Sequence, residues 1–454
     1  MPVSVLSGRH RHGGHGGAPG PPPLPHPWTI HARNTPGRRH RHGGPGHRPG
    51  SRPPSLASRP DPGLVDRTRP AQRHLYLPAL PEVSEDLRVS QAVTQLTLTA
   101  FMVGIAVGQL VIGPLSDTLG RRRPLLAGLT VYVVAGAVCA VAPDPAILIG
   151  MRSVQGPAGA AGLVIARAVV RDLYDGPGAA RLLSSLMLVS GTAPILAPVL
   201  GAQLLRLTSW RGVFLALALL GLAILATTAA SLTETLPLPR RRPGGLAITL
   251  RTMRGLLQDR PLTGYLLTGS LGFAALFAYI AGSSFTLQRI YGASPQAYSL
   301  LFALNSIGMV ATGQLNGKVL LARFPSHRIL AAGLTVLACA GTTLVLLVTT
   351  THAGLPWIAA ALFLVACPVG MILPTTTALC LQRAPHTAGS ASVLLGTTQF
   401  LMGALAPALA GLGGRNTALP MAASVLGLAL AAAACFPALC RPWRATPDPL
   451  AQQG

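Results

Sequence analysis

The chain is dominated by a series of apolar runs that contain at most one charged residue each. Each run can supply the roughly 20 helical residues needed to cross a hydrocarbon core of about 30 Å. Backbone polar groups in lipid must be paired within such a segment, so the runs are predicted to be α-helices. Counting one long run twice gives eleven predicted spans. The runs are 89–116, 124–143, 145–166, 182–205, 212–233, 261–288, 290–317, 329–382 (long enough for two spans), 387–414 and 416–440.

Composition supports an all-α membrane protein and argues against a soluble one. Only 11% of the 454 residues are charged, against about 25% in an ordinary soluble domain. The net charge of +24 would suit a nucleic-acid binder, but most of the basic residues lie in residues 1–74 and in short loops between the runs. Residues 1–74 also contain one aromatic residue, Trp28, for base stacking. We therefore expect lipid rather than nucleic acid as the partner of the chain.

The placement of basic residues predicts the orientation. If the loop with Arg121, Arg122 and Arg123 is cytoplasmic, eighteen basic residues fall on that side of the membrane and six on the other, and the C-terminus is cytoplasmic. Eleven spans would then leave the arginine-rich residues 1–74 outside, against the same rule. We therefore expect a first helix to be missing before Leu75 because of a frameshift or a mistaken start. The alternative is a genuine disordered extension.

Five runs precede a basic central loop and six follow it, so one restored helix gives two six-helix halves. The predicted organisation has five parts: a disordered Gly/Arg/Pro/His-rich segment at 1–74, a first helical half at 75–236, a cytoplasmic linker at 237–262, a second helical half at 263–443 and a cytoplasmic tail at 444–454.

The loop after the first run reads Gly-Pro-Leu-Ser-Asp-Thr-Leu-Gly-Arg-Arg-Arg. Its glycines permit close helix approach and a tight turn, and its aspartate can pair with an arginine or a helix N-terminus. With this motif between two spans, the chain resembles the major facilitator superfamily of transporters. The resemblance implies a conformational latch made by Gly113, Asp117, Gly120, Arg121, Arg122 and Arg123. The alternative is an ordinary basic loop, and Thr118 stands where the family usually has a basic residue.

Further stretches resemble the Bcr/CflA (bicyclomycin-resistance type) subfamily of drug exporters. They are Tyr76–Pro81, Gln95–Phe101, Gly108–Asp117, Arg167–Asp172 and Ala193–Pro198, within a resemblance that extends over about residues 75–443. His74 stands where the first helix of that family ends with an acidic residue. The resemblance implies a major-facilitator fold that exports small drug-like molecules in exchange for protons.

Two further motifs fall inside predicted spans. Arg152, followed by Gln155 and Gly156, resembles the arginine motif of helix 4, and an intramembrane arginine is expected to couple protons or bind substrate. The alternative is an arginine that snorkels to the interface. Gly191, Pro194, Pro198 and Gly201 partly match the antiporter motif of helix 5, where proline and glycine bend a helix. The alternative is a kinked helix with no role in gating.

Polar and aromatic residues inside the spans are candidates for the wall of a transport cavity, although such aromatic residues also pack between helices. They are Gln95, Tyr132, Phe273, Phe277, Tyr279, Asn305, Gln314 and Gln399. The six cysteines form no C-x-x-C pair, and no acids, histidines or nucleophiles cluster at one membrane face. We therefore expect no metal, no cofactor beyond a proton gradient, and no enzymatic activity.

Taken together, these features predict a monomeric, multi-pass protein of the cell membrane that exports small drug-like or antibiotic molecules by proton antiport. Export of a small metabolite, such as an amino acid or nucleobase, is an alternative that the same motifs would serve. A transport-defective truncated product is a second alternative.

Overall fold

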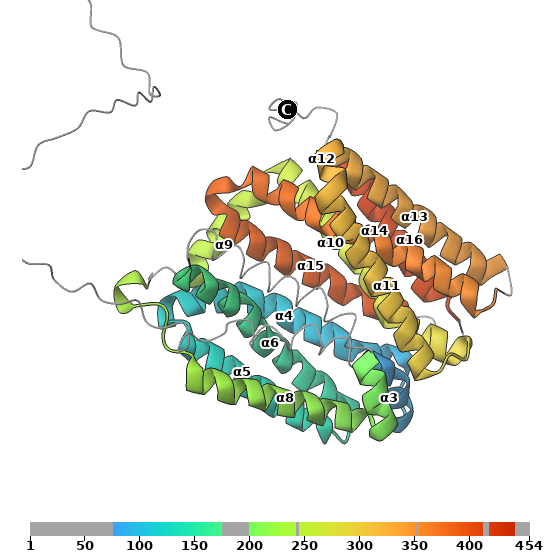
Figure 1. Ribbon diagram of the computed structural model, residues 1–454, viewed down its shortest axis with the longest axis horizontal. Coiled ribbons are helices and arrows are strands. Elements are labelled where there is room, and N and C mark those ends of the chain that lie inside the picture. The colour runs from blue at the N-terminus through green and yellow to red at the C-terminus, as the bar shows by residue number, and fades with distance from the viewer. Residues whose placement is uncertain (1–75, 175–198, 242–244, 351–352, 412–416, 441–454) are drawn as a thin grey trace, which may run out of the picture. The chain divides into compact units, whose positions relative to one another are not determined.

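A computed structural model describes residues 76–174, 199–241, 245–350, 353–411 and 417–440, and over these residues the chain is helical without β-strands (Figure 1). The first part contains η2 (Leu77–Ala79), α3 (Leu80–Asp86), α4 (Gln91–Leu119), α5 (Arg122–Ala140), α6 (Pro145–Leu173), a helical segment at 199–207 and α8 (Trp210–Ser231). The second part contains η3 (Leu238–Arg240), α9 (Gly245–Leu256), α10 (Arg260–Phe285), η4 (Thr286–Ile290), α11 (Pro295–Leu315), η5 (Asn316–Leu320), α12 (Leu321–Arg323), α13 (Ser326–Thr350), α14 (Leu355–Arg383), η6 (Pro385–Thr387), α15 (Ala388–Gly411), α16 (Leu419–Cys435) and η7 (Phe436–Cys440).

The described residues contain nine helices that are long and apolar enough to cross a membrane. The predicted run 329–382 is divided into α13 and α14, as its length required. The predicted run 290–317 corresponds mainly to α11, which is not among the nine, and most of the run 182–205 lies outside the described residues. The all-helical fold is therefore confirmed, whereas the number of eleven spans stays a prediction.

Short polar side chains define where several spans begin. The Asp144 carboxylate accepts a hydrogen bond from the backbone N–H of Ile147 (2.9 Å) at the start of α6. The Ser294 hydroxyl does the same for Ala297 (3.1 Å) at the start of α11. These contacts satisfy backbone donors that lack a partner in the first helical turn. They therefore define the residues at which these two apolar helices begin.

The spans pack in two groups. The first group contains α4, α5, α6 and α8, and the second contains α10, α11, α13, α14, α15 and α16. The main contact between the groups is made by α4 and α15, which run antiparallel. The hydroxyl of Thr99 on α4 donates a hydrogen bond to the Ala404 carbonyl oxygen on α15 (2.9 Å). Below, the end of the first group that carries Arg121 is called the Arg121 end, and the opposite end is called the α3 end.

The predicted linker at 237–262 contains structure that the sequence did not indicate. It holds η3 and the twelve-residue helix α9, and α10 already begins at Arg260. Helix α9 contacts both α4 and α15, so it touches both groups of spans.

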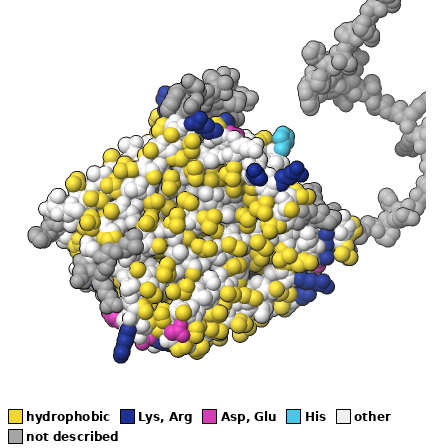
Figure 2. All heavy atoms as spheres, turned by 180° about the vertical axis from the view of Figure 1, so that it is seen from behind, with side chains coloured by type: hydrophobic (Ala, Val, Ile, Leu, Met, Phe, Trp, Pro, Cys, Tyr) yellow, Lys and Arg dark blue, Asp and Glu magenta, His cyan; other side chains and the backbone are white. Residues whose placement is uncertain are grey.

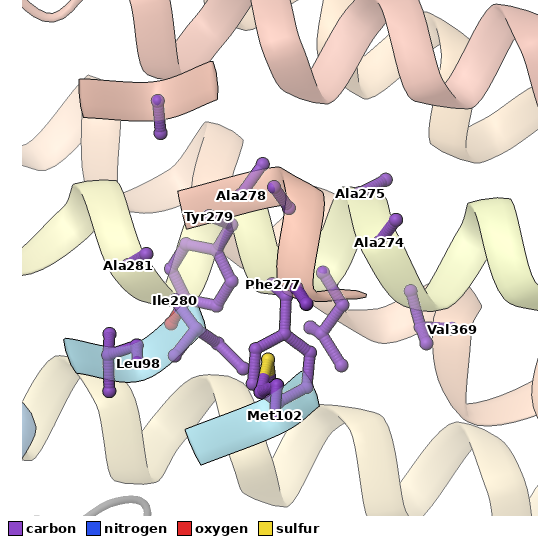
Figure 3. Packing of buried hydrophobic residues seen from close by; sticks show 14 of the residues in the cluster. Leu98, Met102, Ala274, Ala275, Phe277, Ala278, Tyr279, Ile280, Ala281 and Val369 are labelled. Atoms are coloured by element: carbon purple, nitrogen blue, oxygen red, sulfur yellow. The ribbon is translucent and has the colours of Figure 1, made fainter. Parts of the chain in front are cut away.

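The surface and the interior of the bundle are both apolar, as a lipid environment requires. On the face shown in Figure 2, hydrophobic side chains cover most of the described surface and charged side chains lie toward its margins. In the interior, Leu98 and Met102 of α4 lie close to Phe277 and Ile280 of α10 (Figure 3). Helix α10 is the most buried of the nine candidate spans and forms the centre of the packing.

Candidate functional site

Arg152 is the one charged side chain with no solvent exposure among the described residues. Its Nη1 donates a hydrogen bond to the Gln155 side-chain oxygen Oε1 (3.0 Å), whereas its Nε and Nη2 have no hydrogen-bond partner. No carboxylate of the described residues lies within ion-pair distance of it. A snorkelling arginine would place its guanidinium at the protein surface, so this enclosed position favours the functional interpretation of the motif.

Aromatic rings from three elements surround the guanidinium of Arg152. Its Cζ lies 4.1 Å from the ring centre of Phe101 on α4, 5.3 Å from that of Tyr76 and 5.7 Å from that of Phe214 on α8. The faces of aromatic rings attract a cation, and the attraction is strongest where water is excluded. The rings therefore compensate part of the cost of burying this charge.

Small residues bring α4 and α6 close enough to build this site. A methyl group added to Gly104 would lie 2.5 Å from the Ser153 carbonyl oxygen, and one added to Gly108 would lie 2.6 Å from Pro157 Cα. A methyl group added to Gly156 would collide with the carbonyl oxygen of Phe101. Glycines spaced four residues apart allow such close helix contact, and here the contact places Phe101 against Arg152.

We expect Gly156→Leu to prevent correct packing of α4 on α6, because the new side chain meets backbone atoms that cannot move aside. Overpacking of this kind costs about 1–3 kcal/mol and more where backbone is involved. The purified variant should melt at a lower temperature than the parent chain in the same detergent. Gly150→Leu on the same helix is the matched control, because nothing lies within 4 Å of a methyl group added at that position. Equal melting temperatures for the two variants would contradict the close crossing.

The second group of spans contributes an uncharged aromatic cluster beside the α4–α15 contact. The ring centres of Phe273 and Phe277 are 4.7 Å apart, and those of Phe273 and Phe400 are 5.4 Å apart. Tyr279 accepts a hydrogen bond at its hydroxyl oxygen from Asn305 Nδ2 (2.8 Å). The predicted cavity residues of the second group thus form two separate contacts, Phe273 and Phe277 with Phe400 of α15, and Tyr279 with Asn305 of α11.

The other predicted cavity residues are placed differently. Gln95 is fully buried and its Nε2 donates a hydrogen bond to the Ala281 carbonyl oxygen on α10 (3.2 Å), so it joins the two groups. Tyr132 packs beside Gly221 on α8, with a methyl group on Gly221 placed 3.1 Å from its ring. Gln399 is half-buried on α15, and Gln314 is exposed on α11, apart from the aromatic cluster.

The predicted latch residues form a compact network around Arg121. The Arg121 guanidinium donates to Asp117 Oδ1 (2.6 Å), to the Ser116 hydroxyl (2.7 Å) and to Asp172 Oδ2 on α6 (2.9 Å). Burial alone would lower the pKa of Arg121, but its hydrogen bonds to Asp172 and Asp117 raise the pKa above the usual value. Arg121 therefore stays charged and connects α4 to α6.

Glu234 extends this network to the segment after α8. Its carboxylate accepts hydrogen bonds from the backbone N–H of Arg121 (2.7 Å), Arg122 (3.3 Å) and Leu236 (3.1 Å). Burial acts to raise the pKa of Glu234, but these hydrogen bonds and the nearby Arg241 lower it below the usual value. The carboxylate therefore caps the N-terminus of α5, where a negative charge is favoured.

Gly120 is required at this position for two reasons. Its φ of +91° is a backbone conformation that residues with a side chain disfavour, and an added methyl group would collide with the Glu234 carboxylate.

Gly113 has room for a methyl group, 3.7 Å from Val164, so the close approach of helices that was expected at Gly113 is made by Gly104 and Gly108 instead. Arg123 is exposed, and the Arg122 side chain donates to the Ala229 carbonyl oxygen (2.9 Å). All of these partners lie in the first half of the chain.

The helix-5 motif is mostly outside the described residues. Gly191, Pro194 and Pro198 cannot be placed, whereas Gly201 is buried in the helical segment at 199–207. The gating role of this motif therefore stays a prediction.

The acidic helix α3 forms a second cluster at the opposite end, which we call the α3 clasp. It consists of three α3 carboxylates and their partners on η4 and at the start of α8, namely Glu82, Glu85, Asp86, Trp210, Arg211 and Arg289. Glu82 accepts a hydrogen bond from the Trp210 backbone N–H (3.2 Å), and Asp86 accepts from the Trp210 indole (3.0 Å) and from Arg211. Glu85 pairs with Arg289 (2.7 Å), the one ion pair among the described residues that joins the first half of the chain to the second.

Two α3 carboxylates have pKa values shifted in opposite directions. Burial raises the pKa of Glu82 above its usual value, and its hydrogen bond from Trp210 offsets part of that effect. The side-chain hydrogen bonds from Arg211 and Trp210 lower the pKa of Asp86. The clasp was not predicted beyond the acidic character of its segment, because its partners lie more than 120 residues away along the chain.

A bundle of apolar helices with one enclosed arginine and charged clusters at both ends is the architecture of a helical membrane protein. The chain belongs to the major facilitator superfamily, whose family model matches residues 70–407. This confirms the resemblance and the all-helical transporter fold.

Several curated proteins are similar over most of their length. An uncharacterized MFS-type transporter, YdgK, of Bacillus subtilis (strain 168) is 35% identical over 82% of this chain and 93% of its own length. A bicyclomycin resistance protein homolog of Haemophilus influenzae is 30% identical over 79% and 90% of the two chains. A chloramphenicol resistance protein of Pseudomonas aeruginosa is 30% identical over 78% and 84%. These relatives confirm the resemblance to drug-efflux transporters.

The solved structure of a bacterial homolog to the human lysosomal transporter Spinster, in an inward-facing and unoccupied conformation, shares the fold. It has a TM-score of 0.67 at 16% sequence identity and covers 86% of this chain and 98% of its own. At this identity the similarity concerns the fold alone.

Proposed function

We propose that the chain exports small drug-like or antibiotic molecules across the cell membrane by proton antiport. The family supplies the general activity, and relatives named for bicyclomycin and chloramphenicol resistance supply the substrate class. The observation that carries the proposal is the enclosed Arg152 in its aromatic surroundings. An ionisable group inside a membrane bundle is costly and is retained where it contacts a substrate or ion pathway.

Alternating access requires contacts at each end of the bundle that form in one state and break in the other. We assign the Arg121 end to the cytoplasm, because basic residues gather there, and the α3 clasp to the exterior. The C-terminus is then cytoplasmic. Asp117, which pairs with Arg121, and Arg152 are the charged groups that we assign to proton coupling. A single chain provides both groups of spans, so a monomer is expected to suffice.

Expression in a bacterial host that lacks its own drug exporters tests the proposal. The chain should raise the minimum inhibitory concentration of chloramphenicol or bicyclomycin, and a protonophore should abolish the effect on drug accumulation. Asp117→Asn should reduce this resistance, and Asp144→Asn, which changes the half-buried N-cap of α6, serves as the control. Unchanged susceptibility to every compound, with the chain verified in the membrane, would contradict drug export.

A further inference from the structure

Helix α9 carries apolar side chains that the bundle does not cover. One of its faces packs inward, where Met253 is buried in the core and Leu256 packs against it. Leu246, Ile248 and Leu250 are instead exposed over 37%, 61% and 43% of their surface. Three exposed aliphatic side chains within five residues are unfavourable in water. We therefore expect a further apolar surface beside this helix.

The neighbours of α9 place this exposed surface at the boundary of the membrane. Arg241, which precedes the helix, pairs with Glu234 of the Arg121 network (3.9 Å). Asp259, which follows the helix, pairs with Arg383 at the end of α14 (3.6 Å). Helix α9 thus lies at the Arg121 end, where it contacts α4 and α15 (Figure 1). Its twelve residues are too few to cross a hydrocarbon core, so it fits the plane of the lipid interface.

The basic residues in this part of the chain have no acidic counterpart. Residues 235–258 contain five arginines and no aspartate or glutamate. Arg251 and Arg254 on α9 are exposed, and neither forms an ion pair with a carboxylate of the described residues. The charge of these two arginines therefore favours an anionic partner outside the chain.

The arginines and the apolar side chains share the exposed side of α9. Leu246, Leu250 and Arg254 follow one another at four-residue intervals, which places them along one side of a helix. Helices with basic residues beside an apolar stripe lie at the boundary between lipid headgroups and acyl chains. Anionic headgroups attract such basic residues. A nucleic acid would match the arginines but would leave the exposed leucines in water.

We propose that α9 lies in the lipid interface at the Arg121 end and binds anionic phospholipid headgroups through Arg251 and Arg254. Leu246, Ile248 and Leu250 then enter the boundary between headgroups and acyl chains. Because α9 also contacts α4 and α15, the bound lipids lie next to both groups of spans. The inference concerns the lipid partner of the chain and does not depend on drug export.

Native mass spectrometry of the purified full-length chain in an uncharged detergent tests the inference. The probes are phosphatidylglycerol and phosphatidylcholine with the same acyl chains, supplied in equal amounts. Each basic residue at an anionic surface contributes about fivefold in affinity. We therefore expect the first bound phosphatidylglycerol to be held at least about tenfold more tightly than phosphatidylcholine. Equal affinities for the two lipids would overturn the inference.

A pair of double variants locates the site. Arg251→Gln combined with Arg254→Gln should remove most of the preference for phosphatidylglycerol. Arg323→Gln combined with Arg328→Gln is the matched control, because it removes the same charge from two exposed positions of the second group of spans. This control should keep the preference. Equal losses in the two double variants would show that the lipid responds only to net charge, and would overturn the assignment to α9.

Two further measurements test the apolar contribution. Ile248→Ser combined with Leu250→Ser should weaken the binding of both lipids, and unchanged binding would contradict insertion of these side chains. Glycerol 1-phosphate, which carries the anionic group without acyl chains, should displace phosphatidylglycerol much less effectively than unlabelled phosphatidylglycerol displaces an isotope-labelled form. Equal displacement would assign the arginines to a free phosphate and overturn the lipid site.

The inference and the proposed function fail in different ways. Drug resistance in cells together with equal affinity for the two lipids would overturn the lipid site and leave export in place. Selective binding of phosphatidylglycerol without resistance to any compound would support the lipid site and contradict drug export.

Discussion

Arg121→Gln is expected to lower the free energy of unfolding by about 2–3 kcal/mol and to abolish drug resistance in the cell assay. The substitution removes the group that pairs with Asp117 and Asp172, and it leaves the Ser116 hydroxyl without its donor. Breaking a buried pair by deleting one partner costs about 3–5 kcal/mol. The smaller expected value reflects Asp117, whose side chain is half exposed and therefore partly screened by solvent.

Two further variants make this prediction specific. Arg121→Lys keeps the positive charge but loses the fork that reaches both aspartates, so it should be intermediate in stability. Arg123→Gln removes a neighbouring exposed arginine of the same motif and should melt close to the parent chain. Thermal unfolding of the three purified variants in one detergent compares them directly. Equal losses for Arg121→Gln and Arg123→Gln would show that only the total positive charge of the loop matters.

The parts of the latch that sequence could predict are those formed by neighbours in the chain. Asp117 and Arg121 are one helical turn apart, and Gly120 lies between them at the end of α4. The spacing of the motif therefore predicts that Asp117 and Arg121 lie close enough to pair. Asp172 and Glu234 complete the same network from 51 and 113 residues away, and no local spacing indicates such partners.

The neighbours of Arg152 could not be predicted from the sequence either, for a different physical reason. Its helical motif was visible in the sequence, but Tyr76, Phe101 and Phe214 were not identified as its neighbours. A helix in lipid is apolar on every face, so the pattern of hydrophobic residues does not reveal which face packs inward. The glycines at 104 and 108 were an available signal, because their spacing indicates a close helix contact. Gln314 is exposed on α11, and its place in the wall of a cavity stays a prediction.

Gly411→Leu is expected to shift the protein toward a state that is open at the α3 end. Gly411 is the last residue of α15, and a methyl group there would lie 2.9 Å from Ala92 Cα and 2.6 Å from the Gln95 side-chain oxygen on α4. The larger side chain must therefore separate the two helices at this end, at a cost of about 1–3 kcal/mol to the closed state. The Glu85–Arg289 ion pair is too exposed to prevent this separation of the helices, since exposed ion pairs contribute about 0–1 kcal/mol to stability.

Hydrogen exchange followed by mass spectrometry measures this shift without added labels. Backbone amides of α3 and of the first turns of α4 should exchange faster in Gly411→Leu than in the parent chain, while α13 and α14 in the second group should be unchanged. Gly427→Leu on α16 is the matched control, because nothing lies within 4 Å of a methyl group added there.

Faster exchange in all helices would indicate unfolding, and Gly411→Ala, with its smaller side chain, would then be the deciding variant. Unchanged exchange at α3 in both Gly411 variants would show that the contact of α4 with α15 does not hold this end closed.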